Sequence, residues 1–320
     1  MAGAAAGPGA ADDWTAAMRA AHFERAWDIS DRALAQICRS GSAKHEGPRH
    51  LQRIWRGEQL RDRRVLVRCY HGLGDTLQFC RFLSPLRRLA REVIVWCQPE
   101  LTSLIATVEG ADRVLPLHDG TLEIDFDVDI EIMEIPHALR ATRDQFEICH
   151  PYLGSTRKQC PPQAPTRGFL SVGLMWDVGD WARHRAVPAH LLKHLNQSCV
   201  QLCSLQRGNA RDAAAAMGAV DISTPDLDIL AERLQRLDLC VCPDGMVAHL
   251  SAALGRETWV MLHADCDWRW PACGSSTLWY PTMRLFRQPV AGDWHSVVAD
   301  VRSALADKVR LRRSVPAAPN

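Results

Sequence analysis

Short apolar runs alternate with helical segments along most of this chain, and one proline-rich segment divides the alternation into two series. A strand-forming run, a polar or glycine-containing turn and an amphipathic segment, repeated in that order, form the pattern of a parallel, doubly wound sheet. The proline-rich segment, residues 161–165 (PPQAP), is typical of a linker. The pattern therefore predicts an α/β protein with two Rossmann-like doubly wound domains facing a cleft.

The predicted strands form two sets of four. They are residues 65–67, 93–96, 113–115 and 128–133 in the first half, and 170–176, 200–205, 239–242 and 258–262 in the second. A final helix is expected at about 294–311. The predicted organisation is a flexible tail (1–11), a helical segment (12–62), an N-terminal Rossmann-like domain (63–160), a C-terminal one (166–312) and a second tail (313–320).

The helical segment begins with a predicted hairpin at residues 15–38, with a break near His22 and Phe23. Small residues recur in it at helical spacing, as they do in one tetratricopeptide repeat. A lone repeat cannot bury its own apolar face. We therefore expect the hairpin to pack on the rest of the chain or on a partner protein.

Composition excludes several classes of protein. The 38 Lys and Arg residues nearly balance the 37 Asp and Glu residues, so a nucleic-acid partner is not predicted. No apolar run approaches the roughly 18 residues of a membrane span, and the N-terminus lacks a secretion signal, so a cytoplasmic location is expected. The twelve cysteines show no zinc-knuckle spacing. Neither a metal nor a cofactor is predicted.

Ligands of parallel sheets bind beyond the carboxyl ends of the strands, so the turns that follow the strands hold the candidate residues. After the first strand, Gly72 and Gly74 let the backbone approach a ligand, and Asp75 is either a functional carboxylate or a helix cap. After residues 239–242, Asp244 and Gly245 precede a helix whose free N–H groups suit a diphosphate. His249 in that helix is a candidate donor contact or a packed core histidine.

Two further turns are weaker candidates. Residues 176–185 contain Arg183, His184 and Arg185, which either bind phosphates or belong to a solvated loop. Residues 203–208 contain Gln206, whose amide suits a base or ribose. The first turn lacks the third glycine of the dinucleotide fingerprint, since Gln78 stands in its place.

Together these turns resemble one family, the bacterial tetratricopeptide-linked glycosyltransferases related to the lipopolysaccharide ADP-heptose heptosyltransferases. The resemblance extends from about Arg64 to the last helix. The matching blocks, in order, are residues 70–79 (YHGLGDTLQF), 204–206 with Gly208 (SLQ, G), 244–250 ending in AHL, 267–270 (DWRW), 279–281 (WYP), 283–288 (MRLFRQ) and 292–294 (GDW).

The resemblance implies a GT-B fold and a metal-independent glycosyltransferase. Such an enzyme moves a sugar, for example heptose, from a nucleotide-diphosphate donor to a hydroxyl-bearing acceptor with inversion. Asp75 is implied as the general base. The implied donor-binding residues are Arg185, Gln206, Asp244, Gly245, Met246 and His249, and the implied acceptor-side residues are Gly72, Gly74 and Gln78. A lipopolysaccharide, another glycan and a protein are all acceptors that this function allows.

Three positions depart from the family pattern. Gly245 and Met246 replace a hydroxyl residue and a small residue, and Ala186 replaces the serine that usually follows the arginine. The change at Gly245 and Met246 favours an alternative function, a non-catalytic nucleotide-sugar-binding or scaffolding protein on a degenerate transferase fold. The presence of both Asp75 and Arg185 favours the enzyme. A nucleotide-sugar epimerase would need the dinucleotide fingerprint that the first turn lacks.

Overall fold

The structure is a computed structural model that describes residues 8–147, 151–154 and 169–314. The chain divides into two compact units. Unit 1 comprises Met1–Thr156, Asp267–Gly274 and Leu278–Pro281, and unit 2 comprises Arg157–Cys266, Ser275–Thr277 and Thr282–Asn320. The predicted linker (161–165) and parts of both predicted tails (1–7 and 315–320) lie outside the described residues. The domain limits inferred from the sequence stay predictions.

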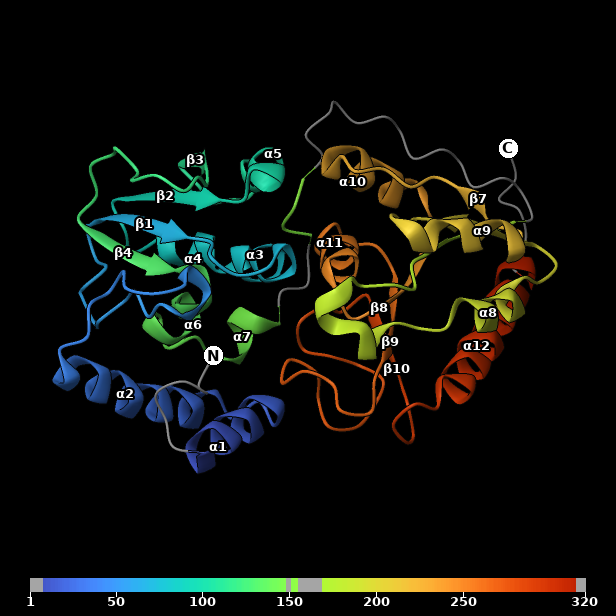
Figure 1. Cartoon of the computed structure of the whole chain (residues 1–320), viewed down its shortest axis with the longest axis horizontal. Coiled ribbons are helices and arrows are strands. Elements are labelled where there is room, and N and C mark those ends of the chain that lie inside the picture. The colour runs from blue at the N-terminus through green and yellow to red at the C-terminus, as the bar shows by residue number, and fades with distance from the viewer. Residues whose placement is uncertain (1–7, 148–150, 155–168, 315–320) are drawn as a thin grey trace. The chain divides into compact units, whose positions relative to one another are not determined.

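Unit 1 is built on a four-stranded parallel sheet in the order β3-β2-β1-β4. Its strands are β1 (Arg64–Arg68), β2 (Glu92–Cys97), β3 (Arg113–Pro116) and β4 (Val128–Glu131) (Figure 1). In the central strand, Val67 lies opposite Val95 of β2 and Ile130 of β4. These side chains are fully buried, which explains the continuous apolar runs of the sequence.

Unit 2 contains a six-stranded parallel sheet in the order β10-β9-β8-β5-β6-β7. Its strands are β5 (Leu170–Leu174), β6 (Val200–Ser204), β7 (Val220–Asp221), β8 (Leu239–Pro243), β9 (Thr258–Leu262) and β10 (Met283–Arg287). Neither β7 nor β10 is among the strands expected from the sequence. β7 has two residues, and β10 contains the exposed Arg284 and the half-buried Arg287, so neither forms a long apolar run.

Helices connect the strands of both sheets. Those of unit 1 are α1 (Pro8–Arg19), α2 (Phe23–Ser40), α3 (Leu73–Phe79), α4 (Leu83–Arg87), α5 (Thr102–Ile105), α6 (Ile135–Ala138) and α7 (Arg143–Phe146). Those of unit 2 are α8 (Ala189–Leu192), α9 (Ala213–Ala216), α10 (Leu227–Arg236), α11 (Met246–Ala253) and α12 (Trp294–Ser314). α12 runs beside α8 and buries Val298 and Val301 in the core of unit 2 (Figure 1).

The predicted hairpin is present as α1 and α2, and it packs on the rest of unit 1. The indole N–H of Trp27 donates to the carbonyl of Ala141 at 2.9 Å, and the rings of Phe23 and Phe146 stack with centroids 4.0 Å apart. α1 begins at Pro8, inside the segment expected to be a tail. The relation of this hairpin to a tetratricopeptide repeat stays a prediction.

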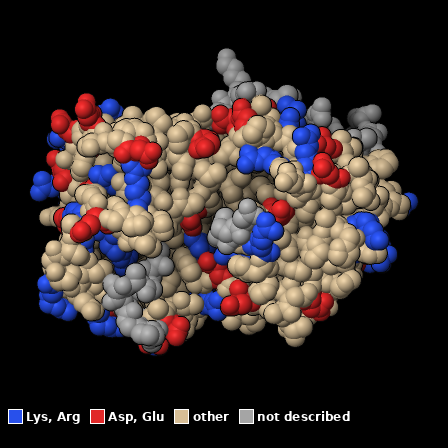
Figure 2. Space-filling view, viewed as in Figure 1, with Lys and Arg blue, Asp and Glu red and all other residues tan. Residues whose placement is uncertain are grey.

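The predicted fold class is confirmed: this is an α/β protein with parallel sheets of four and six strands and short N-terminal helices. On the face shown in Figure 2, acidic and basic side chains are interspersed, in keeping with a net charge of +1. Within the described part of the chain, no helix combines the length and apolarity needed to cross a bilayer.

Candidate functional site

Asp75 lies at the carboxyl end of β1, in the first turn of α3. It is the third residue of that helix, and its Oδ2 accepts a hydrogen bond from the backbone N–H of Gly72 at 3.0 Å. The carboxylate therefore caps α3 by accepting a hydrogen bond from the residue that precedes the helix. The side chain is 25% exposed, so one face of the carboxylate can still meet a ligand.

Arg269 forms an ion pair with the other oxygen of this carboxylate. Its Nη2 contacts Asp75 Oδ1, its Nε donates to Gln78 Oε1 at 2.6 Å, and its Nη1 donates to Asp267 Oδ1 at 2.8 Å. Arg269 lies 194 positions from Asp75 in the sequence, in a segment between β9 and β10 that belongs to unit 1. Sequence reasoning singled out this DWRW segment but assigned it no role in the site.

The three predicted acceptor-side residues serve this arrangement in different ways. Gly72 supplies the N–H that Asp75 accepts, and a Cβ added there would lie 3.3 Å from the carboxylate. Gly74 is inside α3 and does not adopt a positive φ. Gln78 is fully buried and positions Arg269 through its side-chain oxygen. Gln78 therefore contributes by orienting Arg269 and, being buried, is not itself exposed to a ligand.

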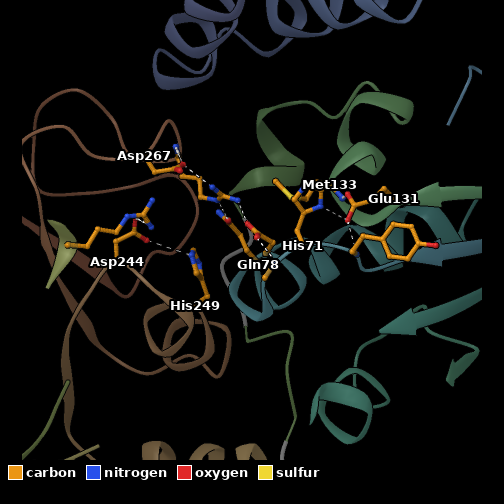
Figure 3. A network of polar contacts seen from close by, with 12 residues as sticks. His71, Gln78, Glu131, Met133, Asp244, His249 and Asp267 are labelled. Atoms are coloured by element: carbon orange, nitrogen blue, oxygen red, sulfur yellow. Dashed lines mark hydrogen bonds and ion pairs between the residues drawn. The ribbon is translucent and has the colours of Figure 1, made fainter. Parts of the chain in front are cut away.

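A histidine and a buried glutamate lie beside Asp75, and sequence reasoning missed both. His71 Nδ1 is 3.0 Å from Glu131 Oε1, and Figure 3 shows His71 between Gln78 and Glu131. The other carboxylate oxygen of Glu131 accepts from the N–H of Met133 at 2.7 Å. Burial of the imidazole lowers its pKa, but the hydrogen bond and charge of Glu131, together with the charge of Asp75, outweigh this effect. On balance the pKa of His71 is raised.

In unit 2, three of the predicted donor-binding residues come together at the carboxyl end of β8. Asp244 is buried, and its Oδ2 lies 3.1 Å from Nη1 of Arg185. Its Oδ1 lies 4.0 Å from Nε2 of His249, which is buried in α11. Figure 3 shows the side chains of Asp244 and His249 turned toward each other. The guanidinium of Arg185 is therefore held beside the start of α11.

Gly245 and Met246 begin α11 directly after this aspartate. Gly245 has φ 178° and ψ −173°, an extended conformation that any residue adopts. Among the described residues, a Cβ added to it would approach Val178 alone, at 3.4 Å. Met246 is partly exposed as the first helical residue. The departure at Gly245 is therefore not required by the local backbone.

Gln206 is buried, and backbone groups engage its amide. Its Oε1 accepts from the N–H groups of Trp176 at 3.0 Å and Asp177 at 2.9 Å, while its Nε2 donates to the carbonyl of Arg207. These hydrogen bonds show that Gln206 stabilises the turn after β5. A cavity of about 380 Å³ lies against that turn, lined in part by Trp176, Asp177 and Arg183, and its volume is within the range of small-molecule sites.

Two features concern metal binding and the thiol nearest to α3. Within them, no group of three or more His, Cys, Asp or Glu side chains could hold a metal ion. Burial raises the pKa of the Cys80 thiol to about 12, so that thiol stays protonated. The predicted absence of a metal and of a cofactor stays a prediction.

We expect Gly245→Ser to be tolerated and, if the start of α11 binds a diphosphate as the sequence resemblance implies, to strengthen the binding of ADP as a probe. The extended backbone and the 3.4 Å contact leave room for the side chain, and a hydroxyl there adds one hydrogen bond worth about 1 kcal/mol, or about five-fold in affinity. Isothermal titration with ADP measures the change, and Gly245→Ala controls for the added Cβ. Equal affinities in the two variants would show that the hydroxyl makes no contact.

No protein-family model matches the sequence, and no curated protein matches it. Solved structures do match the fold. The Escherichia coli heptosyltransferase WaaC, solved with ADP-2-deoxy-2-fluoro heptose, has a TM-score of 0.54 and 12% identity, over 77% of this chain and 99% of WaaC. A glycosyl transferase family 9 protein of Veillonella parvula gives 0.55 and 12%, over 79% and 99%. The E. coli ADP-heptose lipopolysaccharide heptosyltransferase II gives 0.54 and 12%, over 77% and 99%. The chain therefore has the GT-B fold of these heptosyltransferase structures.

Proposed function

We propose that this protein is a glycosyltransferase that moves a sugar from a nucleotide-diphosphate donor to an acceptor hydroxyl with inversion. The observation that carries the proposal is the presence of two complementary sites in a heptosyltransferase-like fold. One holds the carboxylate of Asp75 at the end of β1, and the other holds the Arg185–Asp244 pair at the end of β8.

The donor is assigned to unit 2. The N-terminus of α11 offers backbone N–H groups and the positive end of a helix dipole, which suit a diphosphate. Arg185 adds a cation that offsets the charge developing on the departing diphosphate. The cavity beside Trp176 and Asp177 has the volume for a nucleoside.

The acceptor hydroxyl is assigned to unit 1, with Asp75 as its general base. A carboxylate that accepts the hydroxyl proton makes the oxygen a better nucleophile toward the anomeric carbon. The helix cap and Arg269 hold the carboxylate in one orientation, which is what a positioned base requires. The acceptors that fit this role are a lipopolysaccharide, another glycan or a protein hydroxyl.

ADP-heptose is the donor we propose to test first. WaaC is solved with an ADP-heptose analogue, and heptosyltransferase II is described as an ADP-heptose enzyme. A thermal-shift panel of ADP-heptose with GDP-, UDP- and dTDP-sugars identifies the donor, because a ligand that binds the native state raises its melting temperature. The proposal fails on the donor side when none of these ligands raises that temperature.

We expect Arg185→Gln to weaken ADP binding by about ten-fold or more. The substitution removes a charge-assisted contact to phosphate, worth about 1.5–3 kcal/mol. Isothermal titration with ADP measures the loss. Lys193→Gln, at an exposed cation of the same unit, is the matched control and should bind like the wild type. Equal affinities in the two variants would remove Arg185 from the donor site.

A second candidate function is a nucleotide-sugar-binding protein without turnover. Two features favour a binding protein. Met246 adds a bulky side chain at the start of α11, where the donor is assigned. The ion pair with Arg269 occupies the carboxylate of Asp75, the proposed base. The two functions differ in one measurement. A transferase releases nucleoside diphosphate from its donor repeatedly, whereas a binding protein raises its melting temperature with the donor and releases none.

A further inference from the structure

His71 and Glu131 form a dyad that the proposed function does not use. Glu131 is 1% exposed and accepts hydrogen bonds from the imidazole and from the backbone of Met133. The backbone N–H of Glu131 donates to Glu134 Oε2 at 3.0 Å, which holds the main chain of Glu131 at the start of the helical turn that follows β4. A buried carboxylate that orients one imidazole nitrogen leaves the other nitrogen aimed for proton transfer.

The second ring nitrogen of His71, Nε2, is accessible for proton transfer. Gln98 Nε2 donates to the backbone carbonyl of His71 at 2.7 Å, which fixes the main chain at the turn after β1. The His71 side chain is 21% exposed, and within the described parts of the chain it has no hydrogen-bond partner besides Glu131. Nε2 is therefore available to exchange a proton with a neighbour and with solvent.

Asp75 is the neighbour that the backbone brings to His71. Its carboxylate accepts from the N–H of Gly72, the residue that directly follows the histidine. The negative charge of Asp75 favours the protonated imidazole, so the two groups act on each other. Among the described residues, the carboxylates of Glu131 and Asp75 act on His71. Glu134, whose pKa is raised to about 7 by burial, accepts from the backbone of Glu131, and Arg269 pairs with Asp75.

We propose that His71 is the proton-accepting partner of Asp75. The inference rests on the proposed function. As the acceptor oxygen bonds to the anomeric carbon, the bond from that carbon to the diphosphate oxygen breaks, and its electron pair leaves with the nucleoside diphosphate. The hydroxyl proton passes to Asp75 and then, because the two side chains form no direct hydrogen bond, through a water molecule to His71 Nε2, and from the imidazolium to solvent.

The charged groups beside Asp75 and beside His71 set the direction in which the proton moves. On the Asp75 side, the guanidinium of Arg269 lies against the carboxylate and forms an ion pair with it. On the His71 side, the buried carboxylate of Glu131 stabilises the imidazolium that forms when His71 takes up the proton. The second transfer returns Asp75 to its ionised form before the next turnover.

The experiment compares His71→Gln with the wild type across a pH series. Release of ADP from ADP-heptose, or of nucleoside diphosphate from UDP-, GDP- or dTDP-glucose, is followed with and without a glycan acceptor. The relay starts from neutral His71, so kcat of the wild type should fall as the pH drops through the raised pKa of His71, above the ordinary value of 6.5. His71→Gln should lower kcat about ten-fold or more at unchanged donor KM and lose this acid limb.

Two further variants separate proton transfer from structure. Glu131→Gln removes the charge that favours imidazolium, so the acid limb should move to lower pH. Imidazole added to His71→Ala should restore part of the lost kcat. His50→Gln, at an exposed histidine of the same unit, is the control and should match the wild type.

The outcomes distinguish the relay from the function on which it rests. A wild type that releases no nucleoside diphosphate from any of these donors overturns the proposed function, and the relay with it. A wild type that turns over, with kcat and acid limb unchanged in His71→Gln, overturns the relay alone. Loss of kcat without a change of the acid limb, and without rescue by imidazole, assigns His71 a structural role and also overturns the relay.

Discussion

Asp75→Asn is expected to lower sugar transfer by about 100-fold or more. An amide keeps the acceptor oxygen that caps α3 but cannot take the hydroxyl proton, and a positioned general base contributes about that factor. Binding of the donor should not change, because the donor is assigned to unit 2. Loss of the ion pair to Arg269 should cost about 1–2 kcal/mol of stability, since Asp267 and Gln78 still engage the arginine. Initial rates of nucleoside diphosphate release and a urea titration measure both effects.

Asp112→Asn is the matched control for this substitution. Asp112 also accepts a backbone N–H, from Val93 at 2.7 Å, and also pairs with an arginine, Arg87, at 2.6 Å. The two variants therefore lose similar local interactions, but only Asp75 lies at the carboxyl end of a strand. Unchanged transfer in Asp75→Asn would limit that aspartate to capping α3. Equal losses in both variants would point to a shared defect in folding.

The sequence was most informative about the strands and about the turns that follow them. Runs such as residues 93–96 and 258–262 are strands buried on both faces, and a central parallel strand needs that uninterrupted apolar pattern. The strand β10 was not predicted, because the exposed Arg284 and the half-buried Arg287 interrupt its apolar pattern. Position in the sheet, which no single segment encodes, decides whether such a run becomes a strand.

The candidate site was predicted only in part, for a related reason. Asp75 and the start of α11 follow strands directly, so local patterns reveal them. The partners of Asp75 and His71 come from distant segments: Arg269 is 194 positions from Asp75, and Glu131 is 60 positions from His71. Long-range pairs are set by the packing of the segments that carry them, and one sequence shows the residues without showing which of them meet.

Arg81 holds the segment that supplies Arg269. Its side chain is 2% exposed and donates to the carbonyl oxygens of Gln78, Phe146 and Trp279, and to the hydroxyl of Tyr152. The guanidinium also lies over the Tyr280 ring, 4.5 Å from its centroid. Trp279 in turn donates from its indole to the carbonyl of Arg269 at 2.8 Å. One buried cation thus connects α3, α7 and the segment that reaches Asp75.

Arg81→Met should destabilise the protein by about 3–5 kcal/mol and lower its melting temperature by on the order of 10 °C. Methionine fills a similar volume but leaves buried carbonyl groups without their donor, and each such group costs about 1–3 kcal/mol. Arg81→Lys keeps the charge and fewer of the hydrogen bonds, so its loss should be intermediate. Differential scanning calorimetry measures the series, with Arg88→Met, at an exposed arginine on α4's C-terminal side, expected within about 0.5 kcal/mol of the wild type. Should Arg81→Met melt like Arg88→Met, the hydrogen bonds of Arg81 would contribute nothing to stability, and the segment that carries Arg269 would be held by its other contacts, among them those of Arg269 with Asp75 and Gln78.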